Sequence, residues 1–283
     1  MFTPDPPAPD DVRRDVERAL AEDIGSGDAT ADLLPPEAQA QAHVITREAA
    51  LLAGRPWFDA CFLALDARAE IRWYAQDGEQ VEANATLCTL RGNARALVGG
   101  ERSALNFLQT LSATATTTAQ YVAAVRGTRA RILDTRKTLP GLRLAQKYAV
   151  RCGGGHNHRI GLFDAILIKE NHIAAAGSLG AAVRAARAAH PRLPLEVEVE
   201  NFAELDAALG AGVDRIMLDE FAPASLRQAV TIVAGRVALE VSGGVGLDSV
   251  RAIAETGVDF ISIGALTKHV RAIDLSMRVD LRA

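Results

Sequence analysis

Basic side chains gather in and around the stretch RCGGGHNHRIG. His158 and Arg159 lie in this stretch, Arg136 and Lys137 precede it, and Lys169 follows the next apolar run. Arginine binds carboxylates through two parallel hydrogen bonds, and lysine adds a point charge. The glycine triplet beside them lets backbone approach a ligand closely. Because the whole chain carries a net charge of −4, the cluster predicts a local anion site and not a general affinity for nucleic acid or anionic membranes.

Two carboxylates follow successive apolar runs further along the chain, Glu198 in LEVEVE and Asp219 in RIMLDE. Their oxygens suit sugar hydroxyls or a hard cation such as Mg²⁺. An ion pair with a nearby lysine, Lys137 or Lys169, is the alternative. Strand alternation places three carboxylates on one face of the first run: Glu196, Glu198 and Glu200. If that face is the interior of a barrel, these groups need cations or substrate hydroxyls as partners.

Glycine follows the last two apolar runs, in VSGG and SIGA. Late loops of α/β barrels often bind phosphate through backbone N–H groups. Either sequence alone is typical of a tight turn. Together they predict a phosphate site made of Ser242, Gly243, Gly244, Ser262, Ile263 and Gly264.

The elements that must position these groups have a regular rhythm. Six runs rich in Val, Ile and Leu are RILDT, DAILIK, LEVEVE, RIMLDE, VALEVSGG and FISIGA. Amphipathic helical segments, such as residues 178–190 and 246–257, lie between them, which predicts a parallel α/β domain. The chain has no G-x-G-x-x-G after its first strand and no Walker A sequence, so a closed or nearly closed barrel fits better than an open nucleotide-binding sheet. In such barrels the carboxyl ends of the strands meet at one rim.

The first part of the chain differs. A helix capped by Asp10 and Asp11 is expected, then short antiparallel strands over residues 39–99, then a helix from near Gly99 that leads into the second part. The three cysteines are odd in number and not closely paired, which argues against a disulfide framework. The start of the chain does not resemble a secretory signal, and no apolar run is long enough to span a bilayer. We therefore expect a soluble cytoplasmic protein.

The run DTRKTLPGLRLAQKYAVRCGGGHNHRIGLFDAILIKENHI resembles the signature of the quinolinate phosphoribosyltransferase family. The blocks ALAEDIGSGDAT, ERSALNFLQTLS, EVEVEN, IMLDEF, EVSGGVG and SIGALT match in order, so the resemblance covers roughly Leu20 to Thr267. It implies an N-terminal α/β sandwich domain, residues 1–116, joined by a C-terminal segment, residues 268–283. An incomplete parallel (β/α) barrel, residues 117–267, is implied to carry the catalytic rim.

The resemblance also implies a reaction. Quinolinate and phosphoribosyl pyrophosphate give nicotinate mononucleotide, pyrophosphate and CO₂ in de novo NAD biosynthesis, with Mg²⁺ and a homodimeric enzyme. Lys137, Glu198 and Asp219 are the implied catalytic residues, and the two carboxylates are also the implied metal ligands. The implied substrate-binding residues are Arg102, Thr135, Arg136, Lys137, His158, Arg159, Lys169, Glu198, Asp219, Ser242, Gly243, Gly244, Ser262, Ile263 and Gly264. Arg102 is implied to reach the site from the neighbouring subunit.

Three positions depart from the family pattern: Ala113 stands for glycine, Glu220 for asparagine and Lys268 for histidine.

Other functions stay open. A paralogue associated with molybdenum transport would use another acceptor, and a phosphosugar aldolase or isomerase would form a Schiff base on a strand-end lysine. A non-catalytic protein that binds a carboxylated metabolite is a third possibility. A zinc site is a separate possibility, with Cys152, His156 and His158 as ligands, although no second ligand pair has zinc-like spacing.

Overall fold

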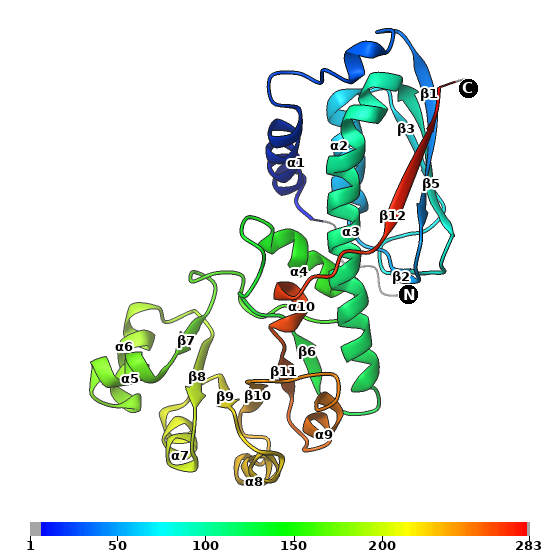
Figure 1. Ribbon diagram of the computed structural model, residues 1–283. Helices are drawn as coiled ribbons and strands as arrows, with labels where there is room; N and C mark the ends of the chain where they lie inside the picture. Colours follow the sequence, from blue (N-terminus) through cyan, green and yellow to red (C-terminus); the bar gives the residue numbers. More distant parts are fainter. Residues whose placement is uncertain (1–6, 282–283) are drawn as a thin grey trace. The chain divides into compact units, whose positions relative to one another are not determined.

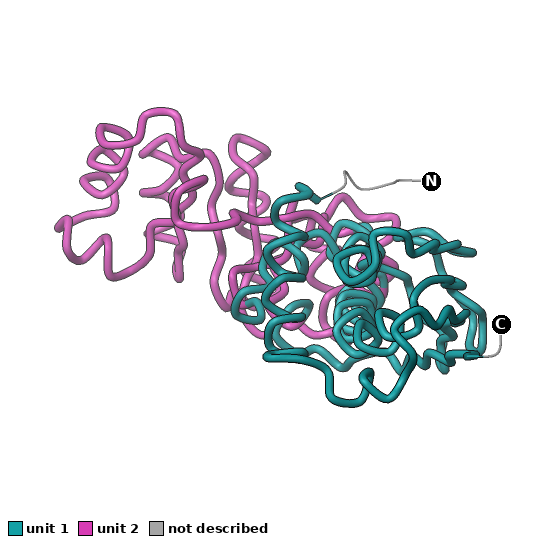
Figure 2. The backbone as a smooth tube through the Cα atoms, turned by 90° about the horizontal axis from the view of Figure 1, so that it is seen from above, with its two compact units in different colours: residues 1–119, 138–154, 266–283 teal, residues 120–137, 155–265 magenta. Residues whose placement is uncertain are grey.

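The computed structural model describes residues 7–281. The chain forms two compact units, coloured separately in Figure 2. Unit 1 contains residues 1–119, 138–154 and 266–283, and unit 2 contains residues 120–137 and 155–265. The limits at 119 and 266 lie near the expected 116 and 268, whereas residues 138–154, expected in the barrel, cluster with unit 1. The expected division into two folding domains stays a prediction.

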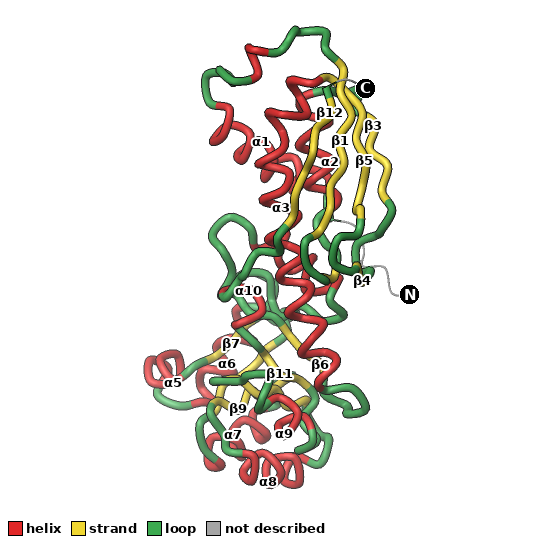
Figure 3. Tube along the Cα trace, turned by 45° about the vertical axis from the view of Figure 1, so that its right-hand side comes forward, coloured by secondary structure: helices red, strands yellow, loops and turns green. Residues whose placement is uncertain are grey.

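Unit 1 combines an antiparallel sheet with helices that cover one of its faces (Figure 3). Its elements, of which α3 ends and α10 begins in unit 2, are α1 (Pro9–Ile24), the 3-10 helix η1 (Ala31–Leu33), β1 (Gln39–Thr46), β2 (Ala50–Leu51), α2 (Arg55–Leu65), β3 (Glu70–Trp73), β4 (Gln80–Val81), β5 (Thr86–Asn93), α3 (Ala94–Ala124), α4 (Arg143–Cys152), α10 (Ala265–Lys268) and β12 (Leu275–Asp280). The predicted first helix, antiparallel strands and long helix are confirmed.

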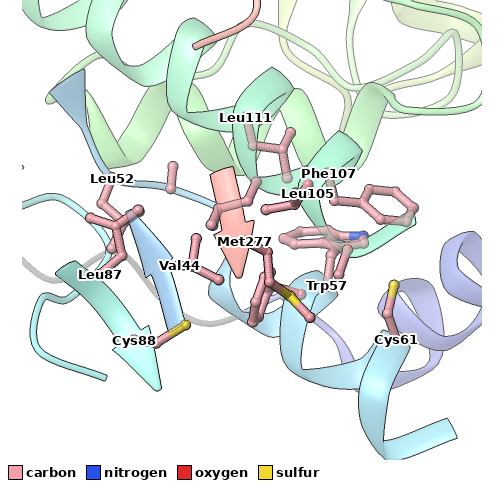
Figure 4. Packing of buried hydrophobic residues seen from close by; sticks show 14 of the residues in the cluster. Val44, Leu52, Trp57, Cys61, Leu87, Cys88, Leu105, Phe107, Leu111 and Met277 are labelled. Atoms are coloured by element: carbon pink, nitrogen blue, oxygen red, sulfur yellow. The ribbon is translucent and has the colours of Figure 1, made fainter. Parts of the chain in front are cut away.

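The main sheet of unit 1 has the strand order β12-β1-β5-β3. In β1, Ala40, Ala42 and Val44 are buried and alternate with more exposed residues, because successive side chains of a strand point to opposite faces. Val44 packs with Trp57, Met277 and other apolar side chains between the sheet and the helices (Figure 4). The free cysteines Cys61 and Cys88 lie in the same core.

The C-terminal segment returns to unit 1, as the family resemblance implies. β12 pairs antiparallel with β1 over six residues, so that Gln41 stands opposite Asp280 and Thr46 opposite Leu275. Without this pairing, β1 would leave an open row of N–H and C=O groups along the sheet. The last strand of the chain therefore completes the sheet that the first strand begins.

Unit 2 is a parallel sheet with helices along it (Figure 1). Its elements are β6 (Arg131–Leu133), β7 (Ile166–Ile168), α5 (Glu170–Ala176), α6 (Leu179–Ala189), β8 (Leu195–Val199), α7 (Phe202–Ala211), β9 (Arg215–Asp219), α8 (Pro223–Val233), β10 (Ala238–Ser242), α9 (Val250–Ala254) and β11 (Phe260–Ser262). All six predicted strands are present, in the order β6-β11-β10-β9-β8-β7. Because β6 and β7 are the two ends of this order, the described sheet is the predicted incomplete barrel.

Among the described residues, no helix has both the length and the apolar character needed to cross a bilayer.

Candidate active site

A cavity of about 180 Å³ lies at the carboxyl ends of the strands of unit 2. All six strands contribute, with residues from their middle, from their carboxyl ends or directly after them, and His158 and Arg159 come from the loop before β7. The lining residues are Thr135, Arg136, Lys137, His158, Arg159, Leu167, Lys169, Glu198, Met217, Ser242 and Ser262. Most of the residues singled out in the sequence therefore meet here, as expected for the rim of a barrel.

Some predicted residues do not line this cavity. Asp219 ends β9 and stands opposite Ser242 in the parallel register, so it lies beside a lining residue. Gly264 lies against the stem of Lys137, since a Cβ atom there would come within 3.0 Å of Lys137 Cδ. Ile263 as a whole residue is only 1% exposed, and its predicted contact with phosphate stays a prediction. Arg102 belongs to unit 1, where its side chain is 61% exposed.

The predicted phosphate loop has unusual backbone. Gly243 and Gly244 adopt φ angles of +96° and +56°, in the left-handed region that glycine enters readily. A Cβ atom on Gly243 would also lie 2.8 Å from Cγ of Glu220. Only glycine fits at position 243, and the predicted role of this loop in binding phosphate stays a prediction.

Two aspartates hold the loop that presents His158 and Arg159. The buried Asp134, just after β6, accepts hydrogen bonds from the His158 N–H at 2.8 Å and from Asn157 Nδ2 at 2.6 Å. Further along the loop, Asp164 accepts the N–H groups of residues 160 and 161 at 2.7 and 2.9 Å. The basic side chains are therefore presented by a backbone that is held on both sides.

Arg159 lies in an electrostatically unfavourable place. Its Nη1 donates to the carbonyl oxygen of Ala165 at 3.2 Å. Burial lowers the pKa of Arg159, and the positive charge of Arg136 lowers it further. Cations that are partly buried and close together repel one another, and a bound anion removes that repulsion. The cavity is therefore suited to a ligand with negative charge.

The acidic residue Glu198, which lines the cavity, forms an ion pair with Lys169. Lys169 Nζ and Glu198 Oε2 are in contact, so the alternative in which a strand-end lysine pairs with Glu198 is confirmed. The Glu198 side chain is 10% exposed and that of Lys169 is 42% exposed. A Schiff base needs a neutral amine. A lysine engaged in an ion pair with a nearly buried carboxylate does not favour the aldolase alternative.

Two further acidic residues, Glu196 and Glu240, lie buried beside His158. His158 Nε2 is 2.8 Å from Glu196 Oε2 and 3.6 Å from Glu240 Oε1. Arg215 Nη1 is 2.8 Å from Glu240 Oε2, and the Ser262 hydroxyl donates to Glu240 Oε1. Burial raises the pKa of Glu196 to about 7, against the lowering effect of Arg215. Burial also raises the pKa of Glu240 to about 7, and the charge of Glu196 adds to that shift.

The zinc alternative is not supported by the described residues. The one group of histidine, cysteine and acidic ligand atoms that the described residues bring together is His158 with Glu196 and Glu240. Cys152 lies buried in α4 of unit 1, and burial raises the pKa of its thiol. A thiol that stays protonated is a poor metal ligand.

The glycine triplet has structural reasons of its own. Gly154 adopts a φ of +82°, in the left-handed region. A Cβ atom on Gly153 would lie 2.5 Å from the Ala115 carbonyl oxygen and 2.6 Å from Thr118 Cβ, both in α3. Close packing of the end of α4 on α3 therefore requires glycine at 153, independently of any ligand.

Sequence reasoning missed several residues of the site. Leu167 and Met217 give the cavity apolar walls, and Glu240 lies beneath it. A signal for Glu240 was present, because alternation in VALEVS places it on the same face as Ser242. Asp134 was visible only as a charged residue at a strand end.

A larger cavity of about 910 Å³ lies in unit 1, between α1 and residues 138–144. Its charged groups already have partners: Arg14 contacts Asp11, and Arg18 lies 2.6 Å from Asp15. Size alone would favour this cavity, but it lacks the converging cations of the smaller one.

Comparison with known proteins gives a consistent result. Residues 28–112 match the N-terminal domain model of quinolinate phosphoribosyl transferase, and residues 114–278 match the C-terminal domain model. The chain is 43% identical to a nicotinate-nucleotide pyrophosphorylase (carboxylating) of Mycobacterium leprae, across 95% of this chain and 97% of that protein. It is 41% identical to a probable enzyme of the same name from Bacillus subtilis, across 92% of this chain and 90% of that protein.

The fold agrees as well. A solved nicotinate-nucleotide pyrophosphorylase from Francisella tularensis superposes with a TM-score of 0.94 at 48% identity, covering 99% of this chain and all of that one. A Pyrococcus furiosus structure of the same name shares the fold at 15% identity, with a TM-score of 0.68. Both domain models together span nearly the whole chain, and the relatives are matched over nearly their full length. The chain belongs to the quinolinate phosphoribosyltransferase family.

Proposed function

We propose that this protein transfers the phosphoribosyl group of phosphoribosyl pyrophosphate to quinolinate and releases CO₂, giving nicotinate mononucleotide and pyrophosphate for NAD biosynthesis in the cytoplasm. The observation that carries the proposal is the convergence of Arg136, Arg159, Lys169 and His158 on one small cavity. Quinolinate has two adjacent carboxylates on a flat ring, which match such a set of cations. Leu167 and Met217 offer apolar surface to the ring.

The chemistry needs positioning and electrostatic stabilisation more than a covalent intermediate. The bond from the anomeric carbon to pyrophosphate breaks as the ring nitrogen bonds to that carbon. Glu198 and Asp219, at the ends of neighbouring strands, are proposed to stabilise the positive charge that develops there, and Lys137 to bind the pyrophosphate. The carboxylate at ring C2 then leaves as CO₂, and its electron pair stays on C2, which takes a proton from water. The pyridinium nitrogen accepts electron density during this step.

Mg²⁺ is proposed to bind beside Glu198 and Asp219. Magnesium often uses one or two carboxylates together with substrate phosphates, and two half-buried or buried carboxylates on adjacent strands fit that donor set. When bound, the ion would neutralise charge on the pyrophosphate. The ion pair between Lys169 and Glu198 means that one Glu198 oxygen is engaged before any metal arrives.

We also propose a homodimer in which Arg102 reaches the partner's site. Arg102 lies on α3, exposed, and does not line the cavity of unit 2. Mixing inactive Arg102→Ala with inactive Arg159→Ala should restore about a quarter of the wild-type activity, because half of the subunits in a random mixture form hybrid dimers with one intact site. Steady-state turnover of the mixture measures this. Activity no greater than the sum of the two variants would contradict a shared site.

The first experiment mixes purified protein with quinolinate, phosphoribosyl pyrophosphate and Mg²⁺ and follows nicotinate mononucleotide and pyrophosphate. A parallel reaction contains nicotinate in place of quinolinate. Product from quinolinate alone supports both the reaction and the binding of two carboxylates. Product from neither acid would overturn the proposed substrate and favour a paralogue with another acceptor.

A further inference from the structure

The interior of the unit 2 sheet holds an unusual pair of acids. Glu196 in β8 and Glu240 in β10 are 7% and 0% exposed, in a layer that barrels normally fill with branched apolar side chains. Oε1 of Glu196 is buried without a hydrogen-bond partner among the described residues. Buried carboxylates cost free energy that apolar residues of similar size would avoid. Because burying these two carboxylates is costly, their position next to the cavity indicates that they serve the site.

Both acids face His158, which lines the cavity. Glu196 Oε2 is 2.8 Å from its Nε2, and Glu240 Oε1 is 3.6 Å from the same atom. The His158 side chain is only 9% exposed. Asp134 fixes the backbone of His158 by accepting its N–H at 2.8 Å. The backbone of His158 is thus fixed by Asp134, and its ring contacts Glu196 with Glu240 nearby.

The other charged groups around His158 act against a positive imidazole. Arg136, Lys137, Arg159 and Lys169 line the same cavity. Positive charges near a histidine disfavour its protonated form, and negative charges favour it. Glu198 is engaged by Lys169, and Glu240 is engaged by Arg215 and Ser262 while also lying 3.6 Å from His158. Glu196, whose Oε2 is 2.8 Å from His158 Nε2, is therefore the acid placed most directly to offset the surrounding cations, and Glu240 is the second.

We propose that Glu196 and Glu240 are positioning residues that hold His158 as an imidazolium with its Nε2–H directed at Glu196. His158 can then add a positive charge for a substrate carboxylate at neutral pH, where an isolated histidine would be mostly neutral. The inference rests on the proposed function for its substrate, a pyridine dicarboxylate. It assigns the two acids no contact with that substrate.

The direct test is the protonation state of His158 in the enzyme alone. Side-chain ¹⁵N NMR distinguishes an imidazolium from either neutral tautomer, and His158→Gln identifies the signal. In the wild type, both ring nitrogens should carry protons at pH 7. In Glu196→Gln and Glu240→Gln, the midpoint of this titration should move to lower pH. A neutral His158 at pH 7 in the wild type overturns the inference, even where neither variant can be purified.

Kinetics provide a second readout. Glu196→Gln and Glu240→Gln should each raise KM for quinolinate about 10-fold or more, as expected for loss of a charge-assisted hydrogen bond, while KM for phosphoribosyl pyrophosphate changes less than about twofold. The rise should become smaller as pH falls through the lowered His158 midpoint of each variant, because protonation there restores the imidazolium. Equal increases in both KM values, or an increase that does not depend on pH, would indicate general structural damage and overturn the inference.

Glu255→Gln is the matched control. It makes the same chemical change on the outside of unit 2, where Glu255 forms an exposed ion pair with Arg251 at 2.6 Å. It should leave both KM values and the His158 titration unchanged. The NMR measurement needs no turnover, so it separates the two proposals: a wild type that makes no product overturns the proposed function, whereas a neutral His158 overturns this inference.

Discussion

Arg159 donates to a backbone carbonyl and lies near Arg136, so its positive charge remains available to a substrate. Arg159→Ala should weaken quinolinate binding roughly 100-fold or more, because truncating one partner of a buried charge pair is costly. Binding of phosphoribosyl pyrophosphate should be nearly unchanged. Calorimetry with each ligand separately measures both. Arg184→Ala, on the exposed face of α6, is the control, and equal loss of both ligands would contradict the assigned role.

Glu220 stands where the family pattern has asparagine, and the structure explains why that matters. Its φ is +54°, in the left-handed region that asparagine tolerates better than glutamate. Glu220→Asn should therefore increase the free energy of unfolding by about 0.5–1 kcal/mol. Urea denaturation followed by circular dichroism measures the change.

Glu255→Asn, at a φ of −71°, should show no such gain. A Glu220→Asn protein that is less stable than the wild type would mean that the carboxylate of Glu220 stabilises the fold, and that backbone strain is not the main effect at this position.

Among the elements, the contact between α4 and α3 depends on a residue without a side chain. Gly153→Ala should lower the free energy of unfolding by about 1–3 kcal/mol, because a Cβ atom there overlaps the backbone of α3. The control is Gly210→Ala in α7, where no atom lies within 4 Å and alanine is the better helix former. Thermal unfolding should separate the two in opposite directions. A Gly153→Ala protein as stable as the wild type would show that α4 can shift without cost.

The sequence predicted the parallel strands well, because strands buried on both faces read as short apolar runs. It did not predict α2 and α4. The aromatic residues at the start of α2 favour strands, although Trp57, Phe58, Cys61 and Phe62 share one helical face. In α4, the polar residues Arg143, Gln146, Lys147 and Arg151 recur at helical spacing, so a periodic signal was present and was not used. What the sequence could not show is that Gln146 and Lys147 are buried.

The candidate site, like the fold, could be predicted from the sequence only in part. Its cations could be predicted because strand ends of a barrel meet at one rim, and the loop sequence is distinctive. The contact of Glu196 and Glu240 with His158 could not, since it joins three distant segments through side-chain reach and burial. Local patterns show which face a residue occupies. They do not show which residues from other strands share that face at the same depth.

Across the whole molecule, the buried acids should make stability depend on pH. The pKa values of Glu196 and Glu240 are raised to about 7 in the fold, above the ordinary value of 4.5. Between these values the native state binds more protons than the unfolded state, so the stabilisation is present below pH 4.5 and is lost as pH rises through 7. The double variant Glu196→Gln/Glu240→Gln lacks this loss.

The stability of the double variant relative to the wild type should therefore rise by about 1–3 kcal/mol per carboxyl group between pH 5 and pH 8. Hydrogen exchange of the β10 amides is the suitable measurement, because both tryptophans, Trp57 and Trp73, lie in unit 1 and fluorescence would not report on unit 2. A difference that is constant with pH would contradict the raised pKa values.

The pairing of β12 with β1 bears on how the protein is made. A ribosome releases residues 39–46 early, yet their partner, residues 275–280, emerges only after all of unit 2 has been synthesised. During that interval, one edge of the unit 1 sheet is open to other chains. Nascent molecules on the same messenger are thus exposed to mispairing until translation is nearly complete, and a premature stop that removes β12 leaves that edge permanently unpaired.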